Sequence, residues 1–212
     1  MMRTFPSAKR AASKTDTRRG SKATRVPEIL QTAARLLARQ GYAAFTTRRV
    51  AEEEGIRLST LQHYFPTREE LLSRTLSGLI ERYAALFRGA TDIAGVPPEA
   101  RLQALIDAGM AELTAPEVAD FWIEVWAMGR HVPFARQLAT EAYELGTREI
   151  ARLIAEINPR LGARECADRA RTISIQFEGL MVLAHRYRAG AEFDAGLAAA
   201  KAVCWAVVRA KP

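Results

Sequence analysis

The stretch from residue 46 to residue 65, TTRRVAEEEGIRLSTLQHYF, constrains the fold of this chain more than any other segment. Val50 gives its first half an inward, apolar face, and Gly55 then tolerates the positive φ on which many helices end. In the second half Leu61 and Phe65 lie four residues apart, so they share one face of a helix. The stretch therefore predicts two short helices joined by a tight turn.

The outer face of the second short helix carries hydrogen-bonding side chains, and none of them is bulky. They are Ser59, Thr60, Gln62 and His63. In a helix-turn-helix the first helix supports the second, whose polar side chains hydrogen-bond to base edges in the major groove. An ordinary helical hairpin with a polar outer face is the alternative, so the flanking sequence has to be considered as well.

Segments on both sides favour the DNA-binding interpretation. Upstream, apolar residues recur at helical spacing over residues 26–37, and Gly41 ends that helix. Downstream, Thr67 precedes a helix whose first turn contains Glu69 and Glu70, where carboxylates are stabilised by the helix dipole. Together the segments predict a three-helix unit followed by a longer helix.

From about residue 25 to about residue 76 the chain resembles the DNA-binding domain of the TetR/AcrR family of transcriptional regulators, and the match needs no gap. The matching residues are Ile29, Leu30, Ala33, Ala34, Gly41, Tyr42, Thr46, Arg48, Val50, Ala51, Gly55, Ile56, Thr60, Leu61, Tyr64, Phe65, Arg68, Glu69, Glu70, Leu71 and Leu72. Arg57 stands where that family usually has a Ser or Thr cap, which leaves Ser59 as an alternative cap. Gln62 stands where an aromatic residue is common.

The resemblance, together with the exposed polar pattern, predicts which residues face double-stranded DNA. We expect the polar side chains of the second short helix at the bases and Tyr64 and Arg68 at the phosphates. The full set is Thr46, Thr47, Arg48, Arg57, Leu58, Ser59, Thr60, Gln62, His63, Tyr64 and Arg68.

The charge distribution supports a nucleic-acid partner. The net charge is +7, but residues 1–74 contain fifteen Lys and Arg against seven Asp and Glu, whereas residues 75–212 contain sixteen against seventeen. A basic first third joined to a nearly neutral remainder indicates that the first third binds a polyanion. DNA is favoured over a membrane because no basic helix has a Trp, Phe or Leu face beside it.

The first 24 residues consist largely of Arg, Lys, Ser, Thr and Ala, a composition that predicts a disordered basic arm. Such an arm either contacts DNA phosphates or is a solvated tail. A transit peptide would need an amphipathic stripe that is missing here, and a signal peptide would need an apolar stretch. The two cysteines, Cys166 and Cys204, lie in apolar helical context and predict buried free thiols, which fits a reducing cytoplasm.

The remainder of the chain predicts helices throughout. A helix over residues 67–88 and a linker rich in Gly and Pro over residues 89–98 lead into the later helices. These are expected at about residues 98–113, 116–130, 134–157, 163–189 and 194–209. The predicted fold class is all-α, with a three-helix helix-turn-helix domain over residues 25–70 and a helical ligand-binding and dimerisation domain over residues 71–212.

Aromatic residues concentrate around Trp122 and Trp126, which lie four apart on one helical face. Such a stripe is either plain core or one wall of a ligand cavity. The cavity hypothesis assigns its lining to Trp122, Trp126, Met128, Phe134, Tyr143, Phe177 and Met181. Two indole faces suit a cationic ligand, with Glu124 or Glu178 as the balancing carboxylate, and an apolar or acyl ligand is the alternative.

This second region resembles the C-terminal domain of the BetI-like branch of the family, which responds to choline. The resemblance lies in the tryptophan-rich helix, in the turn from His131 to Pro133, and in the QHYF sequence at residues 62–65. It implies a small-molecule effector but does not identify it.

The last two predicted helices each have apolar residues on two faces. Ile175, Val182 and Val203 lie off the main apolar stripes, so each helix needs two partners. The resemblance implies that one partner is a second copy of the chain, which gives a homodimer through the last two helices.

Competing classes of protein are disfavoured. A helical enzyme would need a poised acid, base or metal, but the three histidines are scattered and no nucleophile, phosphate-binding or metal-ligand motif is present. A protein-interaction adaptor would not explain why the positive charge concentrates around the helix-turn-helix. No apolar run approaches the roughly eighteen residues of a membrane span. We therefore expect a cytoplasmic, homodimeric, ligand-responsive transcriptional regulator that represses by binding a palindromic operator, with no catalytic residue, metal or cofactor.

Overall fold

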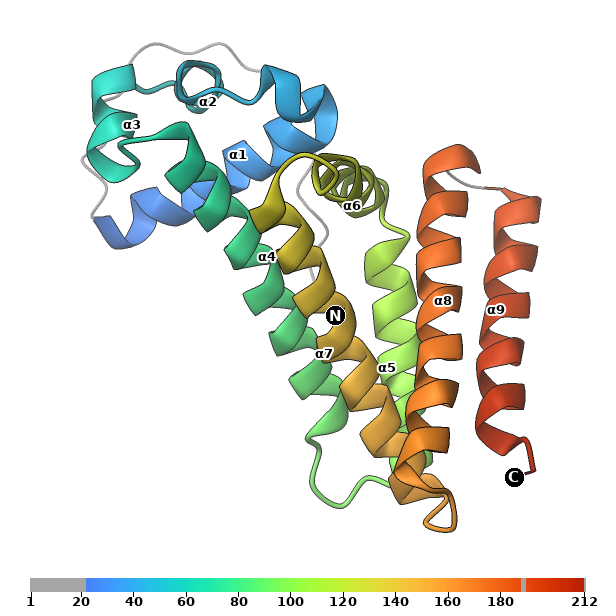
Figure 1. Ribbon diagram of the computed structural model, residues 1–212. Coiled ribbons are helices and arrows are strands. Elements are labelled where there is room, and N and C mark those ends of the chain that lie inside the picture. The colour runs from blue at the N-terminus through green and yellow to red at the C-terminus, as the bar shows by residue number, and fades with distance from the viewer. Residues whose placement is uncertain (1–21, 188–189, 212) are drawn as a thin grey trace.

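The computed structural model describes residues 22–187 and 190–211, which form nine helices and no strand (Figure 1). The helices are α1 (Lys22–Ala44), α2 (Thr47–Glu54), α3 (Leu58–Tyr64), α4 (Arg68–Thr91), α5 (Pro98–Leu113), α6 (Pro116–Met128), α7 (Pro133–Ile157), α8 (Ala163–Tyr187) and α9 (Ala191–Arg209). The predicted all-α fold class is confirmed.

The first three helices and the start of α4 surround a small apolar core at one end of the molecule (Figure 1). Ile29 and Leu37 of α1 are completely buried in it, as are Val50 of α2 and Leu61 of α3. Because α2 and α3 are short and each has only one apolar face, the unit depends on α1 and α4 for its stability.

The other helices form a larger bundle in which α4, α5, α7 and α8 pack along one another. Helix α9 lies beside α8 at the outer edge (Figure 1). Helix α6 runs across the top of this bundle and is seen almost end-on in Figure 1. It contacts α1 on one side and α7 and α8 on the other, so together with α4 it connects the two ends of the molecule.

The observed helix ends differ from the predicted ones by a few residues. Helix α4 continues through residues 89–91, which were expected to begin the linker, and the amide of Asp92 still bonds to the carbonyl of Arg88 at 2.9 Å. The predicted domain boundary after residue 70 falls within the first turn of α4, because this helix begins at Arg68. Residues 1–21 of the predicted basic arm lie outside the described residues, whereas residues 22–24 form the first turn of α1.

A buried arginine ties α8 to the end of α9. The Arg169 side chain is only 5% exposed, and its guanidinium donates to the carbonyls of Val207, Val208, Ala210 and Lys211. It also pairs with Glu165 at 2.7 Å. The last carbonyls of a helix have no partner within it, so a buried cation at this position satisfies them.

In the described part of the chain, every helix is too short or too polar to cross a membrane.

Candidate DNA-binding surface and effector pocket

The turn between α2 and α3 is built by local capping. The Thr46 hydroxyl accepts from the amide of Arg49 at 3.1 Å and starts α2, and Gly55 ends it in the left-handed region with φ of 71°. Helix α3 begins after Arg57 without a side-chain cap, and Ser59 lies inside the helix. The alternative that Ser59 caps α3 is therefore wrong, since the chain has already become helical at Leu58.

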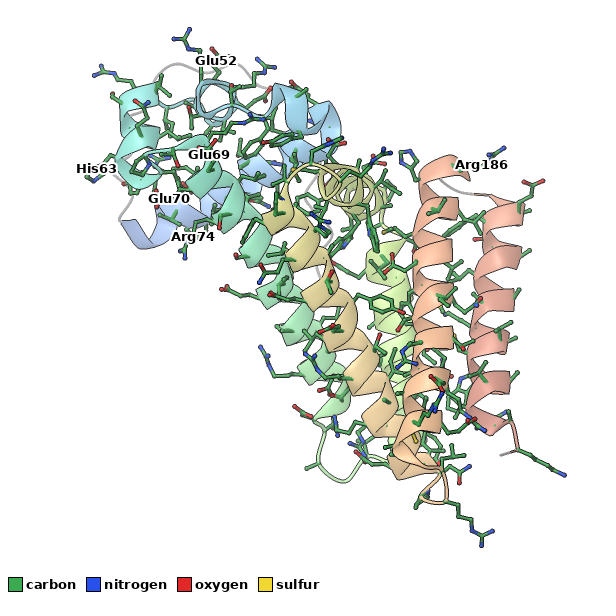
Figure 2. All side chains as sticks on the ribbon, viewed as in Figure 1. Glu52, His63, Glu69, Glu70, Arg74 and Arg186 are labelled. Atoms are coloured by element: carbon green, nitrogen blue, oxygen red, sulfur yellow. The ribbon has the colours of Figure 1, made fainter. Side chains whose placement is uncertain are left out.

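The outer face of α3 carries the polar side chains that the sequence predicted there. All four are exposed, namely Ser59, Thr60, Gln62 and His63, and His63 projects from the outer edge of the molecule (Figure 2). The opposite face is fixed in the core, because Leu61 is fully buried and Phe65 is 2% exposed. Arg48 and Arg57 are exposed on the neighbouring α2 and turn. This surface therefore presents hydrogen-bonding groups flanked by two guanidinium groups.

The remaining predicted contact residues are less available to a partner. Thr46 is exposed but its hydroxyl is engaged as the cap of α2, while Thr47, Leu58 and Tyr64 are half-buried. Arg68, expected at the phosphates, is directed inward instead. The Arg68 guanidinium donates to the backbone carbonyl of Tyr42, in α1, at 2.6 Å and lies over the aromatic ring of Tyr42.

Polar contacts to α1 and within α2 hold α2 in place, and they were not predicted from the sequence. The Thr32 hydroxyl of α1 donates to Glu54 of α2 at 2.5 Å and accepts from Arg35 at 3.0 Å. Arg49 pairs with Glu53 four residues later at 2.9 Å, a spacing that was readable in the sequence. The Thr32–Glu54 bond joins residues far apart in the chain, so no local signal announces it.

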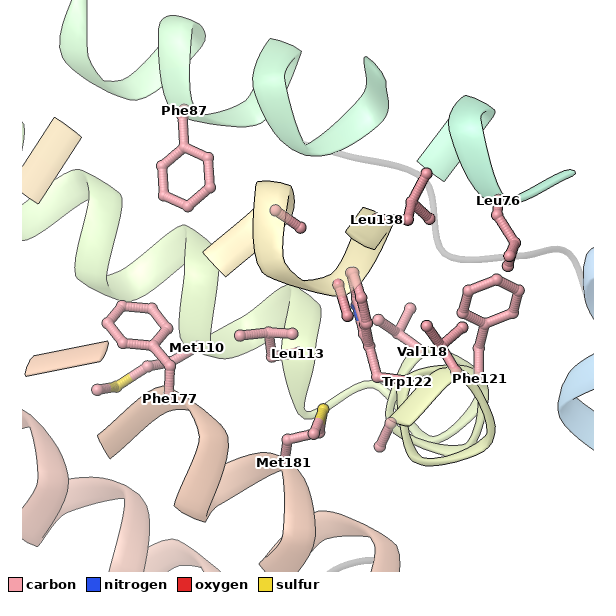
Figure 3. Close-up of a cluster of buried hydrophobic side chains, with 14 of the residues drawn as sticks. Leu76, Phe87, Met110, Leu113, Val118, Phe121, Trp122, Leu138, Phe177 and Met181 are labelled. Carbon is pink, nitrogen blue, oxygen red and sulfur yellow. The ribbon is translucent and has the colours of Figure 1, made fainter. Parts of the chain in front are cut away.

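A small pocket with a volume of about 50 Å³, partly open to solvent, lies between α4, α5, α6, α7 and α8. Its lining residues are Phe87, Leu113, Trp122, Trp126, Ala139, Ala142, Tyr143, Gly146, Ile150, Ser174, Phe177 and Glu178. Phe87, Trp122 and Phe177 extend from α4, α6 and α8 toward the region next to α7 (Figure 3). Its mostly apolar lining with a few polar groups is typical of small-molecule sites, whereas its volume is smaller than the roughly 300–1,000 Å³ of such sites, so a ligand would have to widen it.

Four of the seven residues predicted for this pocket line it: Trp122, Trp126, Tyr143 and Phe177. The other three are not among its lining residues. Met128 and Met181 are buried in the surrounding core, and Phe134 is 37% exposed near the start of α7. These three belong to the same helices as the lining residues but lie on other faces of them, which helical spacing alone did not separate.

Two glycines make room for the aromatic rings at the pocket. A Cβ atom at Gly146 would lie 2.9 Å from the Phe87 ring, and one at Gly109 would lie 2.6 Å from the Phe177 ring. Both distances are shorter than real carbon contacts, so only glycine allows the rings these positions. An isolated glycine within a helix was the signal that could have located this close packing.

The one carboxylate of the pocket belongs to Glu178. Burial raises its pKa from 4.5 to about 7, because the charged form loses hydration. No hydrogen bond or ion pair joins it to any residue within the described ranges. Glu124, the other carboxylate considered from the sequence, lies outside the pocket and accepts from the amide of Tyr42 at 2.6 Å. Of the two, only Glu178 is placed to meet a ligand.

Comparison with known proteins identifies the architecture. Residues 29–75 match the family model of bacterial regulatory proteins of the TetR family, and residues 98–208 match the C-terminal domain of BetI-type transcriptional repressors. The chain belongs to the TetR family.

Individual TetR-family relatives agree with this assignment. The BetI regulator of Burkholderia mallei is 27% identical over 154 residues, which cover 70% of this chain and 76% of the relative. The KstR2 repressor of Mycobacterium tuberculosis is 34% identical over 96 residues, so this match spans only 44% of KstR2 and 45% of this chain. A Saccharomonospora viridis regulator, solved with choline, has a TM-score of 0.72 at 22% identity and covers 85% of this chain and 95% of that one.

The family assignment also excludes the enzyme alternative, because the TetR-family relatives are transcription regulators. In the described part of the chain, no group of three His, Cys, Asp or Glu side chains is placed to hold a metal ion.

Proposed function

We propose that this chain is a homodimeric repressor that binds a palindromic operator and is released from it by a small cationic effector. The observation that carries the DNA-binding part is the exposed polar face of α3 above a fully buried apolar face. A recognition helix needs this division, since one face has to be rigid while the other is free to hydrogen-bond to base edges.

The proposed dimer interface is the outer face of α8 and α9. Ile175 and Val182 of α8 are 59% and 52% exposed, and Val203 of α9 is 40% exposed. Along α9 the neighbouring exposed positions are alanines, so the two helices together offer an apolar surface. Pairing this surface with that of a second copy would bury it in a four-helix arrangement, and the family resemblance supports that arrangement.

The dimer would set the distance between two recognition helices. Two helix-turn-helix units bind successive major grooves on one side of DNA when they are roughly 34–36 Å apart. An effector that changes this distance would weaken operator binding, because both half-sites could no longer be bound at once. The pocket is lined both by α4, which begins in the DNA-binding unit, and by α8, one of the proposed dimer helices, so a ligand bound there could change this distance.

We infer a cation as the effector from Glu178 and the tryptophans. A carboxylate in an apolar pocket without a partner would be stabilised by a cationic ligand, and the faces of Trp122 and Trp126 would add about 0.5–2 kcal/mol each through cation–π contacts. The choline bound to the similar Saccharomonospora viridis protein supports this ligand class. An apolar or acyl ligand, held by buried area, is the competing class.

The test begins with selection of binding sites from random DNA duplexes, followed by gel shifts with the selected duplex. We expect one palindromic sequence, bound by two chains, and release when choline is added. The Ser59→Ala and Gln62→Ala variants should lose sequence preference, whereas Gln137→Ala, on the exposed surface of α7, should not. A protein that binds all duplexes equally, or none, would contradict the proposal.

Effector class is tested with the same duplex and a panel of choline, betaine aldehyde, polyamines and fatty acyl compounds. Release by a cation, lost in Trp122→Ala with DNA affinity retained, supports the proposal. Release by acyl compounds alone would replace the cation with the competing class.

A further inference from the structure

We propose that Glu124 transmits the state of the effector pocket to the DNA-binding unit through its hydrogen bond to the amide of Tyr42. The proposal rests on the proposed function and adds the residue through which the two sites are connected. Glu124 acts as a positioning residue, because it lies outside the pocket and outside the DNA-binding surface.

The position of Glu124 on α6 places it between the two sites. Trp122 and Trp126, two residues before and two residues after it, both line the pocket. At about 100° per residue a separation of two residues turns the helix by about 200°, so Glu124 lies on the opposite side. Any rotation or shift of α6 caused at the tryptophans therefore moves the Glu124 carboxylate as well.

The receiving end is a kink near the end of α1, where the backbone leaves the helical conformation at Gly41. Gly41 has φ of 74° and ψ of 175°, a conformation that is essentially restricted to glycine. A Cβ atom at this position would lie 3.1 Å from Oε1 of Glu124, and that same oxygen accepts from the amide of Tyr42 at 2.6 Å. The chain is thus shaped to let the carboxylate approach this backbone segment.

Tyr42 in turn contacts the segment that follows the recognition helix. Arg68, the first residue of α4, donates to the Tyr42 carbonyl at 2.6 Å, and its guanidinium carbon lies 4.2 Å from the centre of the Tyr42 ring. Only three residues separate Arg68 from the end of α3. Glu124, Tyr42 and Arg68 therefore form a continuous contact chain from α6, through the end of α1, to the start of α4.

This contact chain is sensitive to small movements. A hydrogen bond weakens steeply with distance and angle, and a charged acceptor makes it about twice as strong as a neutral one. A shift of α6 of the order of an ångström would be enough to break the Glu124–Tyr42 bond. The recognition helix would then lose one of the restraints on its orientation.

Coupling between two sites is reciprocal, which allows a test that needs no effector. If Glu124 connects the sites, DNA binding has to alter the surroundings of Trp126, which is 48% exposed in the free protein. The probe is acrylamide quenching of tryptophan emission in a Trp205→Phe background, with and without the duplex selected above. Trp122 and Trp126 are the two tryptophans that remain.

We expect DNA to change the quenching constant when Glu124 is present and to leave it unchanged in Glu124→Ala. Glu124→Gln should restore the change, since its amide oxygen can still accept from the Tyr42 amide. Glu117→Ala, an exposed carboxylate on the first turn of the same helix, is the matched control and should behave like the parent. Choline should weaken DNA binding by a factor that is typically 5–150 for coupled sites, and in Glu124→Ala this factor should fall toward 1.

Two outcomes overturn the inference while leaving the proposed function intact. One is quenching that DNA does not affect in the parent protein. The other is a DNA effect of the same size in Glu124→Ala, which would mean that DNA shields the tryptophan directly. Failure to select any duplex would overturn the proposed function, and this inference with it. Circular dichroism of each variant shows whether the helices are retained.

Discussion

At the residue scale, Glu178 makes the proposed effector binding dependent on pH. Burial raises its pKa to about 7, so the carboxyl group is half ionised near pH 7 and becomes increasingly neutral, and unable to pair with a cation, as the pH falls further. Choline affinity, measured by fluorescence titration from pH 5.5 to 8.5, should be constant above about pH 8 and fall about tenfold by pH 6.

The Glu178→Gln variant should bind choline weakly and without this pH dependence. The uncharged analogue 3,3-dimethylbutan-1-ol, which has the same shape as choline, serves as the control for both proteins. If the analogue and choline bound with the same pH profile, Glu178 would not be the group that recognises the charge.

Gly41 allows a separate prediction about stability. Alanine at this position would have to adopt φ near 74° and ψ near 175°, so Gly41→Ala should lower the free energy of unfolding by roughly 1–3 kcal/mol. The control is Gly78→Ala, because Gly78 is exposed within α4 and a Cβ there meets no atom within 4 Å. Gly78→Ala should stabilise the protein by up to about 1 kcal/mol. Urea denaturation of both variants measures the difference, and equal midpoints would contradict the strain argument.

At the scale of helices, Arg169 is expected to hold the end of α9 against α8. Removing it in Arg169→Ala would leave the buried carbonyl of Val208 and the part-buried carbonyl of Ala210 without this donor, and we expect a loss of about 2–4 kcal/mol in unfolding free energy. Arg171→Ala removes an exposed arginine two residues later and should change stability by less than about 0.5 kcal/mol. Chemical denaturation compares them, and an Arg169→Ala loss no larger than that of Arg171→Ala would refute the capping role.

The helices themselves could be predicted from the sequence because their signals are local. Apolar spacing, Gly55, and the cap at Thr67 placed the helix-turn-helix and the start of α4, and the same spacing gave the later helices to within a few residues. The end of α4 was misplaced because Gly89 is tolerated in a helix whose neighbouring residues pack against the bundle. Propensity is only a weak guide where tertiary contacts decide.

The candidate sites were harder to predict because they are assembled from distant helices. The wall formed by Trp122 and Trp126 has a local spacing signal, but Phe87 enters the pocket from α4, which is remote in sequence. Arg68 has the composition of a phosphate contact and is instead bonded to α1 across 26 residues. Glu124 and Glu178 are placed differently only because different helices pack around them on α6 and α8. These tertiary contacts cannot be read directly from the sequence.

At the scale of the whole molecule, the proposed dimer depends on an apolar surface that is exposed in a single chain. Ile175 and Val182 contribute little to the core of one chain, so an aspartate at either position should leave the fold intact. In a symmetric dimer each substitution occurs twice and buries unpaired charges, at a cost of several kcal/mol. The Ile175→Asp and Val182→Asp variants should therefore be folded monomers by light scattering.

The monomeric variants should also bind the operator much more weakly, because a single chain can occupy only one half-site. Ile93→Asp is the matched control, since Ile93 is likewise an exposed apolar residue, 44% exposed, but lies in the connection between α4 and α5. It should remain dimeric and retain operator affinity. Dimers of unchanged stability in both α8 variants would move the interface to another face, and the spacing of the two recognition helices would then have to be set by different elements.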